Sequence, residues 1–175
     1  MLPPLVFVVV VSMVKDAYED IIRHIEDDKE NSAKTMRYNK EIDDFAEYHW
    51  SDVRVGDFVR IRENEFFPAD LLLLTTSEGE GNAYVETKNL DGETNLKNKN
   101  AMSITNDEFL NGENLSNMRG IINCEHPNNR IYKFDGNFQL ESGVARASEL
   151  SNKQEKVSVS SNNVVLRGMS LRNTE

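Results

Sequence analysis

The chain has 175 residues, which is long enough for one domain with a hydrophobic core and a smaller appendage. It carries 30 acidic and 20 basic side chains, and the formal net charge of -10 disfavours nucleic acid as a partner, because nucleic-acid binding needs a basic surface. Cys124 is the only cysteine, so an intrachain disulfide is excluded and a reducing, cytosolic environment is favoured.

The N-terminal part predicts the end of a membrane helix that continues as a stalk. Residues 2–14 are apolar except for Ser12, but a membrane span needs roughly 17–25 such residues. Beyond them, apolar side chains recur at helical spacing up to Ile25, with charged residues between them. We therefore expect one continuous helix that leaves apolar surroundings and enters the cytosol as an amphipathic stalk, with residues 1–40 forming this unit. A buried helix of a soluble domain is the alternative interpretation.

From Glu41 to the C-terminus, short alternating segments predict a mainly β domain. Valines alternate with polar residues on both sides of Gly56-Asp57, which indicates a bulged or turned strand pair between Val53 and Ile61. Asp135-Gly136 is predicted to form a type I′ turn between the two strands that flank it. Such a series of strands and turns is typical of an antiparallel sandwich or jelly roll. The further strands are predicted over Leu71–Leu74, Ala83–Thr87, Arg119–Cys124, Arg130–Phe134, Asn137–Leu140, Val157–Val159 and Val164–Arg167.

Two polar segments lack the pattern of a core. Residues 98–118 are rich in asparagine, and a short helix over Asn106–Leu110, capped by Asn106 or Asp107, is predicted within them. Residues 142–154 are predicted to form a loop. Either segment could bind a partner, but exposed loops are the favoured interpretation.

The histidine and cysteine residues do not form a recognisable metal site. Cys124 and His126 are close in sequence, but a zinc site needs further ligands at suitable spacing. His24 and His49 add no such spacing. All four are interpreted as structural, and no metal ligand is expected in this chain.

The strongest candidate for a functional site is the segment Tyr84-Val-Glu-Thr-Lys-Asn-Leu-Asp-Gly-Glu-Thr-Asn-Leu-Lys97. Within it, Asp91-Gly92 predicts a tight turn that is followed directly by Glu93. Glycine supplies the backbone freedom for the reversal and for close approach to a phosphate. We expect the turn to direct Glu93 outward, where it can meet a reacting group on another surface. The alternative is a simple hairpin turn with a polar neighbour.

Several segments, in their order along the chain, resemble the actuator region of the type-IV P-type ATPases, the phospholipid flippases. The first of them, Val14–Asp20, is similar to the cytosolic exit of that family's second transmembrane helix. The last, Leu166–Thr174, is similar to the segment that leads towards the third transmembrane helix. The loop reads Asp91-Gly-Glu-Thr94, whereas ion-pumping relatives generally have Thr-Gly-Glu-Ser, and this difference points to lipid flippases. The segments are Val14–Asp20 with His24, Val55–Asp57 with Asn64–Leu74, Glu86–Lys97, Cys124–Asn129 and Leu166–Thr174.

The resemblance implies a distorted jelly-roll actuator domain over residues 41–175, behind an N-terminal stalk helix. Pumps of this family form an aspartyl phosphate, and their actuator domain brings a glutamate to the water that hydrolyses it. By resemblance, Glu93 is that glutamate, acting as a general base or orienting the water. Gly92 would let the loop pass close to the phosphate, while Asp91 and Thr94 would shape the loop and Glu86 would cap or support it.

For the complete protein, the resemblance implies an ATP-driven phospholipid-translocating pump in a membrane, with this region on the cytosolic face. ATP and Mg2+ would be bound by domains absent from this chain, because the family's Asp-Lys-Thr-Gly-Thr phosphorylation motif does not occur in it. The chain is therefore expected to be a fragment that is inactive alone. Its expected partners are the phospholipid, the phosphorylation domain of the same polypeptide and, as a possible addition, a helper subunit. The alternatives are a non-catalytic, membrane-docked β binding module and the actuator of an ion-transporting pump.

Overall fold

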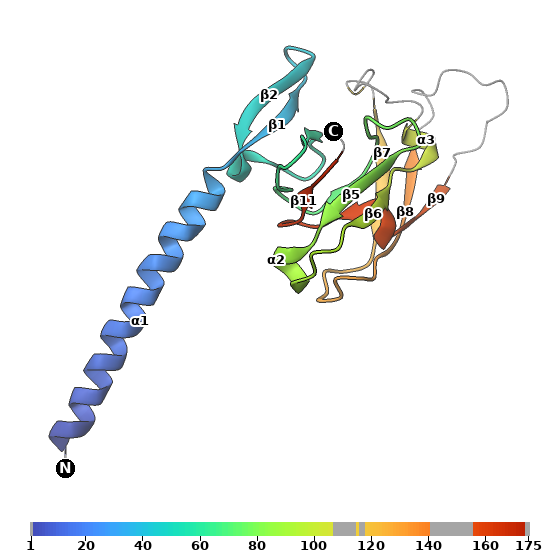
Figure 1. Ribbon diagram of the computed structural model, residues 1–175. Coiled ribbons are helices and arrows are strands. Elements are labelled where there is room, and N and C mark those ends of the chain that lie inside the picture. The colour runs from blue at the N-terminus through green and yellow to red at the C-terminus, as the bar shows by residue number, and fades with distance from the viewer. Residues whose placement is uncertain (1, 107–114, 116–117, 141–155, 174–175) are drawn as a thin grey trace, which may run out of the picture.

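The computed structural model describes residues 2–106, 115, 118–140 and 156–173, and it is mainly β with one long N-terminal helix. Helix α1 (Leu2–Asn31) projects away from the β body (Figure 1). The prediction of one continuous helix through the apolar and amphipathic regions is thus confirmed, as is the mainly β fold class. In the described part of the chain, no helix combines the length and the apolar character that crossing a membrane requires.

The chain enters the β body through a small antiparallel sheet with the strand order β2-β1-β3. β1 (Lys34–Asn39) forms a hairpin with β2 (Asp44–His49), and its other edge pairs with β3 (Val59–Arg60). The first strand therefore begins before Glu41, the residue from which the alternating short segments were expected. Charged residues interrupt the apolar alternation of β1 in the sequence, although Tyr38 is buried in the fold.

The predicted strand pair between Val53 and Ile61 is wrong in its first half. Residues 53–58 contain no strand, and Val55 is fully exposed beside a turn in which Gly56 has a φ of +91°. The Asp57 carboxylate accepts a hydrogen bond of 2.8 Å from the backbone N–H of Arg54, which closes this turn locally. The second half is β3, which pairs with β1 rather than with residues 53–55.

The strand that leads to the candidate site lies at the centre of a second sheet, with the order β11-β5-β6. Both neighbours pair antiparallel with β5. A separate antiparallel pair is formed by β4 and β10. The predicted strands are confirmed, β4 and β10 in shorter form and β5 displaced by one residue, whereas β6 and β11 were not predicted. The bounds are β4 Leu71–Leu72, β5 Asn82–Glu86, β6 Lys97–Asn100, β10 Val164–Val165 and β11 Ser170–Leu171.

A third antiparallel sheet has the order β7-β8-β9, with β7 at Gly120–Cys124, β8 at Asp135–Leu140 and β9 at Lys156–Ser160. The predictions for β7 and β9 are confirmed. The predicted strand over Arg130–Phe134 and the turn at Asp135-Gly136 are wrong, because Asp135 and Gly136 already pair as part of β8. Pairing with strands on both sides overrides the local preference of Asp-Gly for a turn.

Short helical turns join the strands, namely η1 (Trp50–Asp52), α2 (Lys88–Asp91), α3 (Ser103–Asn106) and η4 (Ser161–Asn163). α3 ends where the helix Asn106–Leu110 was predicted to begin. Asn106 is buried, its side-chain oxygen accepts from Thr76 N at 3.3 Å and its side-chain amide donates to the Gly79 carbonyl at 3.1 Å. Residues 107–110 and the predicted loop over residues 142–154 lie outside the described residues.

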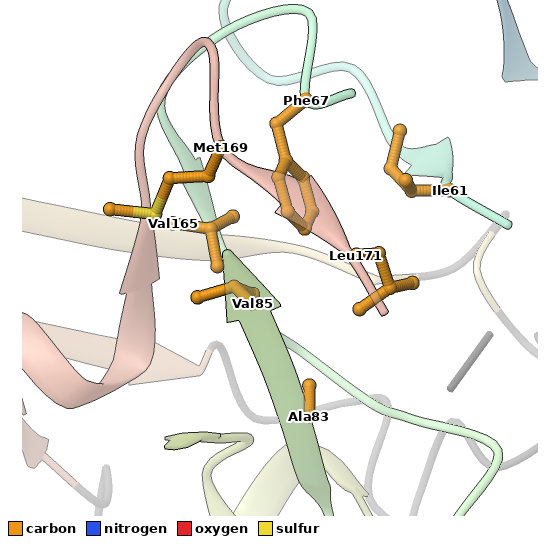
Figure 2. Close-up of a cluster of buried hydrophobic side chains, with 7 residues drawn as sticks. All are labelled: Ile61, Phe67, Ala83, Val85, Val165, Met169 and Leu171. Atoms are coloured by element: carbon orange, nitrogen blue, oxygen red, sulfur yellow. The ribbon is translucent and has the colours of Figure 1, made fainter. Parts of the chain in front are cut away.

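Two main clusters of buried apolar side chains hold the sheets together. The first lies between β5, β10 and β11 (Figure 2), and Leu90 of α2 packs against it from the site loop. The second lies under β8 and β9 and includes Phe138 and Leu140. Burial of this apolar surface is the main term that stabilises the body. The first cluster consists of Ile61, Phe67, Ala83, Val85, Val165, Met169 and Leu171.

Candidate functional site

The segment between β5 and β6 forms a single helical turn followed by a sharp reversal. The Thr87 carbonyl accepts hydrogen bonds from Leu90 N at 2.8 Å and Asp91 N at 3.1 Å, which closes α2. Gly92 then ends the turn in the left-handed conformation, with φ +76° and ψ 0°. A side chain would strain the backbone there, which is the physical reason for glycine at this position. The predicted reversal is present, but a helical turn precedes it.

The Asp91 carboxylate is the centre of this loop. Its Oδ1 accepts a hydrogen bond of 2.8 Å from the backbone N–H of Glu93, and both of its oxygens lie 2.9 Å from the Thr87 hydroxyl, which donates to them. Its Oδ2 accepts from Lys97 Nζ at 2.6 Å and from the Tyr132 hydroxyl, also at 2.6 Å. We refer to Thr87, Asp91, Lys97 and Tyr132 as the Asp91 cluster.

Lys97 joins the Asp91 cluster to the candidate catalytic side chain. Its Nζ lies 3.0 Å from Glu93 Oε2, in addition to its shorter contact with Asp91. The same ammonium group lies 4.6 Å from the centre of the Tyr132 ring, which is within the range of a cation–π interaction. Lys97 therefore contacts two carboxylates and one aromatic ring at the start of β6.

Tyr132 reaches this loop from a distant part of the chain, the connection between β7 and β8. That connection lies next to α2 at one end of the body (Figure 1), and the hydrogen bond to Asp91 spans 41 positions in sequence. The position of Tyr132 follows from the third sheet, because β7 and β8 pair in register and so fix both ends of the connection.

The contacts within the cluster favour its charged state. The hydrogen bond from Lys97, followed by that from Tyr132, holds the pKa of Asp91 well below its usual range. The hydrogen bond to Asp91 in turn raises the pKa of Lys97, and it also raises the pKa of Tyr132 because it stabilises the protonated phenol. Asp91 is thus a carboxylate and Lys97 an ammonium at neutral pH.

Glu93 differs from Asp91 in its exposure. The Glu93 side chain is 56% exposed, whereas that of Asp91 is 9% exposed. Thr94 is also exposed, and a Cβ added at Gly92 would meet no atom within 4 Å. The loop therefore presents the Glu93 carboxylate on an open surface, and the less exposed Asp91 carboxylate supports it through the Glu93 backbone N–H. Such a carboxylate can accept a proton from a water or orient it by a hydrogen bond.

The two ends of this loop are anchored to the body. Leu90 packs on the first core cluster, and its Cδ2 is the atom nearest to a Cβ built on Gly168, at 3.7 Å. Glu86, at the end of β5, accepts a hydrogen bond of 2.8 Å from Arg172 Nε, and Arg172 also donates to the Asn64 side chain at 2.9 Å. Glu86 therefore supports the sheet beside the loop and does not contact Glu93.

The predicted site residues Asp91, Gly92, Glu93 and Thr94 lie together, but the sequence prediction missed three of their contacts. Thr87 and Lys97 belong to the same segment, where their polar character beside Asp91 was a usable signal. Tyr132 had no such signal, because its contact depends on the folding of the third sheet.

The described residues do not include a group of three or more His, Cys, Asp or Glu side chains that could hold a metal ion. His24 lies 3.8 Å from Asp28 on α1, and the Nδ1 atom of His49 lies 3.0 Å from the Ser32 carbonyl oxygen. Cys124 is exposed at the end of β7.

The fold and the site define a mainly β domain that carries a projecting helix and an exposed glutamate loop. No family model matches the chain. It is 43% identical to phospholipid-transporting ATPase 6 of Arabidopsis thaliana over 174 residues, which are 99% of this chain and 13% of the relative. It is 39% identical to phospholipid-transporting ATPase IC of Mus musculus over 99% of this chain and 13% of the relative.

A third relative is phospholipid-transporting ATPase DRS2 of Saccharomyces cerevisiae, with 37% identity over 97% of this chain and 12% of the relative. The chain thus spans about an eighth of the length of these curated relatives. The similarity runs along almost the whole chain, and it confirms the resemblance to the type-IV P-type ATPases, the phospholipid flippases. The chain corresponds to one segment of such a pump.

Proposed function

We propose that this chain is the actuator segment of an ATP-driven phospholipid-translocating pump, and that Glu93 acts in hydrolysis of the pump's aspartyl phosphate. The observation that carries the proposal is the loop geometry. Glu93 is exposed directly after the left-handed Gly92, and its backbone N–H donates to the largely buried side chain of Asp91. Relatives along the whole chain carry names that state phospholipid transport.

In the proposed reaction, Glu93 contacts a water placed in line with the phosphorus. The water oxygen forms a new bond to phosphorus, the bond from phosphorus to the aspartyl oxygen breaks, and the Glu93 carboxylate takes the water's proton. Gly92 gives the phosphate room to approach, because no atom lies within 4 Å of where a Cβ would be. Asp91 acts through the Glu93 backbone and Thr94 lines the exposed side of the loop.

We assign ATP and Mg2+ to other domains of the complete pump. The described residues offer no cluster that fits a metal ion, so no step is assigned to Mg2+ within this chain. The partner that carries the phosphate is the phosphorylation domain of the same polypeptide, and the transported substrate is a membrane phospholipid. A helper subunit belongs to the same proposal as a further partner.

In the proposed division of the chain, residues 1–40 are the end of a transmembrane helix with its cytosolic stalk, and residues 41–175 are the actuator domain. The exposed apolar side chains of α1 between Leu5 and Val14 suit a membrane environment, and the charged half that follows suits the cytosolic side. Rotation of the body would be coupled to the membrane through α1, because a continuous helix is a rigid element.

The substitution Glu93→Gln tests this function in a complete pump that carries the segment. We expect the aspartyl phosphate to accumulate and its hydrolysis to slow by about 10²- to 10⁴-fold, because the amide does not take up a proton. The measurement is the decay of the phosphorylated pump after a chase with unlabelled ATP. The matched control is Glu63→Gln, which makes the same change at an exposed glutamate outside the loop.

Equal decay in Glu93→Gln and in the unaltered pump would contradict the catalytic assignment. It would favour the alternative of a non-catalytic, membrane-docked β module that acts by binding.

A further inference from the structure

An exposed catalytic carboxylate needs a fixed direction, and two contacts restrain Glu93. Its backbone N–H donates to Asp91 Oδ1 at 2.8 Å, and its carboxylate lies 3.0 Å from Lys97 Nζ. Gly92 before it has no side chain and adds no restraint of its own. The direction of Glu93 therefore depends on how firmly Asp91 and Lys97 are held.

Tyr132 contacts both of these supports. Its hydroxyl donates to Asp91 Oδ2 at 2.6 Å, and its ring centre lies 4.6 Å from Lys97 Nζ. With Oδ1 bound to Glu93 N and Oδ2 bound to Lys97 and Tyr132, rotation of the carboxylate would break bonds on both sides. Tyr132 thus restrains the plane of the Asp91 carboxylate and the position of the Lys97 ammonium together.

The exposure of Tyr132 argues against a role in packing alone. The residue is 57% exposed, whereas an aromatic ring that stabilises a core is usually buried. Two oriented polar contacts on an exposed ring affect the local geometry more than the free energy of unfolding of the whole domain.

We infer that Tyr132 is a positioning residue for Glu93, and that it acts through Asp91 and Lys97. The inference rests on the proposed function of Glu93 as the group that engages the water. Lys97 has a second role in it, because its positive charge offsets the repulsion between the Glu93 carboxylate and an approaching phosphate. Tyr132 links Asp91 and Lys97 to the third sheet. The direction of Glu93 therefore depends on the position of the β7–β8 connection.

The first test measures the decay of the phosphorylated intermediate in a complete pump carrying Tyr132→Phe or Lys97→Met. We expect Tyr132→Phe to slow the decay by about three- to tenfold, the effect of one lost hydrogen bond, and Lys97→Met to slow it more. The rate of phosphorylation from ATP should stay unchanged. The controls are Tyr84→Phe, on β5, and Lys88→Met, which removes the same charge from an exposed position on α2.

Glu93→Gln, measured in the same series, separates the two proposals. If Glu93→Gln slows the decay while Tyr132→Phe and Lys97→Met match their controls, the positioning role is wrong and the function of Glu93 stands. If Glu93→Gln has no effect, the proposed function itself is wrong, and the positioning role is wrong with it.

The second test follows the Glu93 backbone amide by NMR in the 175-residue chain, as a function of pH. The amide donates to Asp91, so its chemical shift reports the ionisation of that carboxylate. Loss of the Tyr132 hydroxyl removes a donor to the charged form, so Tyr132→Phe should move the transition to higher pH, because the pKa of Asp91 rises towards its usual value. An unchanged transition in Tyr132→Phe would overturn the inference, whereas Tyr84→Phe should leave it unchanged.

Discussion

Gly92 holds a backbone conformation that residues with a side chain rarely adopt, directly before the candidate catalytic Glu93. Its φ of +76° lies in the left-handed region, which costs an L-residue with a side chain roughly 1–2 kcal/mol. Space is not the constraint, because a Cβ at this position would meet nothing within 4 Å. Within the chain itself, the requirement for glycine is therefore conformational.

The variant Gly92→Ala should lower the free energy of unfolding of the chain by about 1 kcal/mol, since alanine disfavours the left-handed backbone. Urea unfolding measures the change. Gly79→Ala is the matched control, because Gly79 also has open space around its Cβ position but its φ lies outside the left-handed range. Equal losses in the two variants would show that the backbone of Gly92 is not the cause.

At the scale of the elements, β7 depends on a close contact between a glycine and an aromatic ring. A Cβ built on Gly120 would lie 2.6 Å from Phe138 Cε2 and 2.8 Å from its Cζ. Phe138 is a buried member of the second core cluster, on the neighbouring strand β8. Because β7 and β8 fix the connection that holds Tyr132, this contact also supports the candidate site.

We expect Gly120→Ala to destabilise the chain by about 1–3 kcal/mol, because the added methyl group displaces the Phe138 ring. The measurement is urea unfolding of Gly120→Ala, Phe138→Leu and the double variant. The double variant should lose less stability than the sum of the two single variants, because the smaller leucine relieves the clash. Strict additivity would contradict the proposed clash.

The strand predictions succeeded or failed for identifiable reasons. β5, β7 and β9 have apolar or alternating sequences that mark a strand. β6 reads Lys97-Asn-Lys-Asn100, without any apolar residue, and its strand character comes from pairing with β5. Lys99 is nevertheless buried, with its ammonium donating to the Ser161 carbonyl at 2.6 Å. Local sequence does not reveal such a strand, because tertiary pairing decides it.

The candidate site shows the same division. The residues from Asp91 to Thr94 were identified because they are contiguous and resemble a family motif. The contribution of Tyr132 was not, because the residue belongs to another sheet and the segment around it was predicted as a strand. A contact across 41 positions leaves no local pattern in a single sequence.

At the scale of the whole molecule, the base of α1 is joined to the body by a small group of polar contacts. Arg167 lies 3.0 Å from the Glu30 carboxylate, and its guanidinium lies 5.9 Å from the centre of the Trp50 ring. Its backbone N–H donates to Asp70 at 2.9 Å. The backbone N–H of Trp50 donates to the Ala33 carbonyl at 2.8 Å, which links η1 to the end of the helix. Arg167 therefore connects the helix to the loop that precedes β11.

The variant Arg167→Ala should loosen the orientation of α1 while changing the stability of the body by less than about 1 kcal/mol, because both partners of the ion pair are exposed. Spin labels at the natural Cys124 and at Glu26→Cys report this orientation through their distance distribution. We expect a broader distribution in Arg167→Ala. The matched control, Arg54→Ala, should leave the distribution unchanged, and broadening in both variants would contradict the role of Arg167.

The length of α1 gives this junction a mechanical consequence. With 30 residues and a rise of 1.5 Å for each, the helix is about 45 Å long. It acts as a lever arm whose pivot lies near Glu30, so a turn of about 10° at the pivot moves the far tip by about 8 Å. For a given torque at the pivot, the force at the tip is inversely proportional to the length of the helix. A few weak contacts at the pivot therefore govern large displacements at the other end.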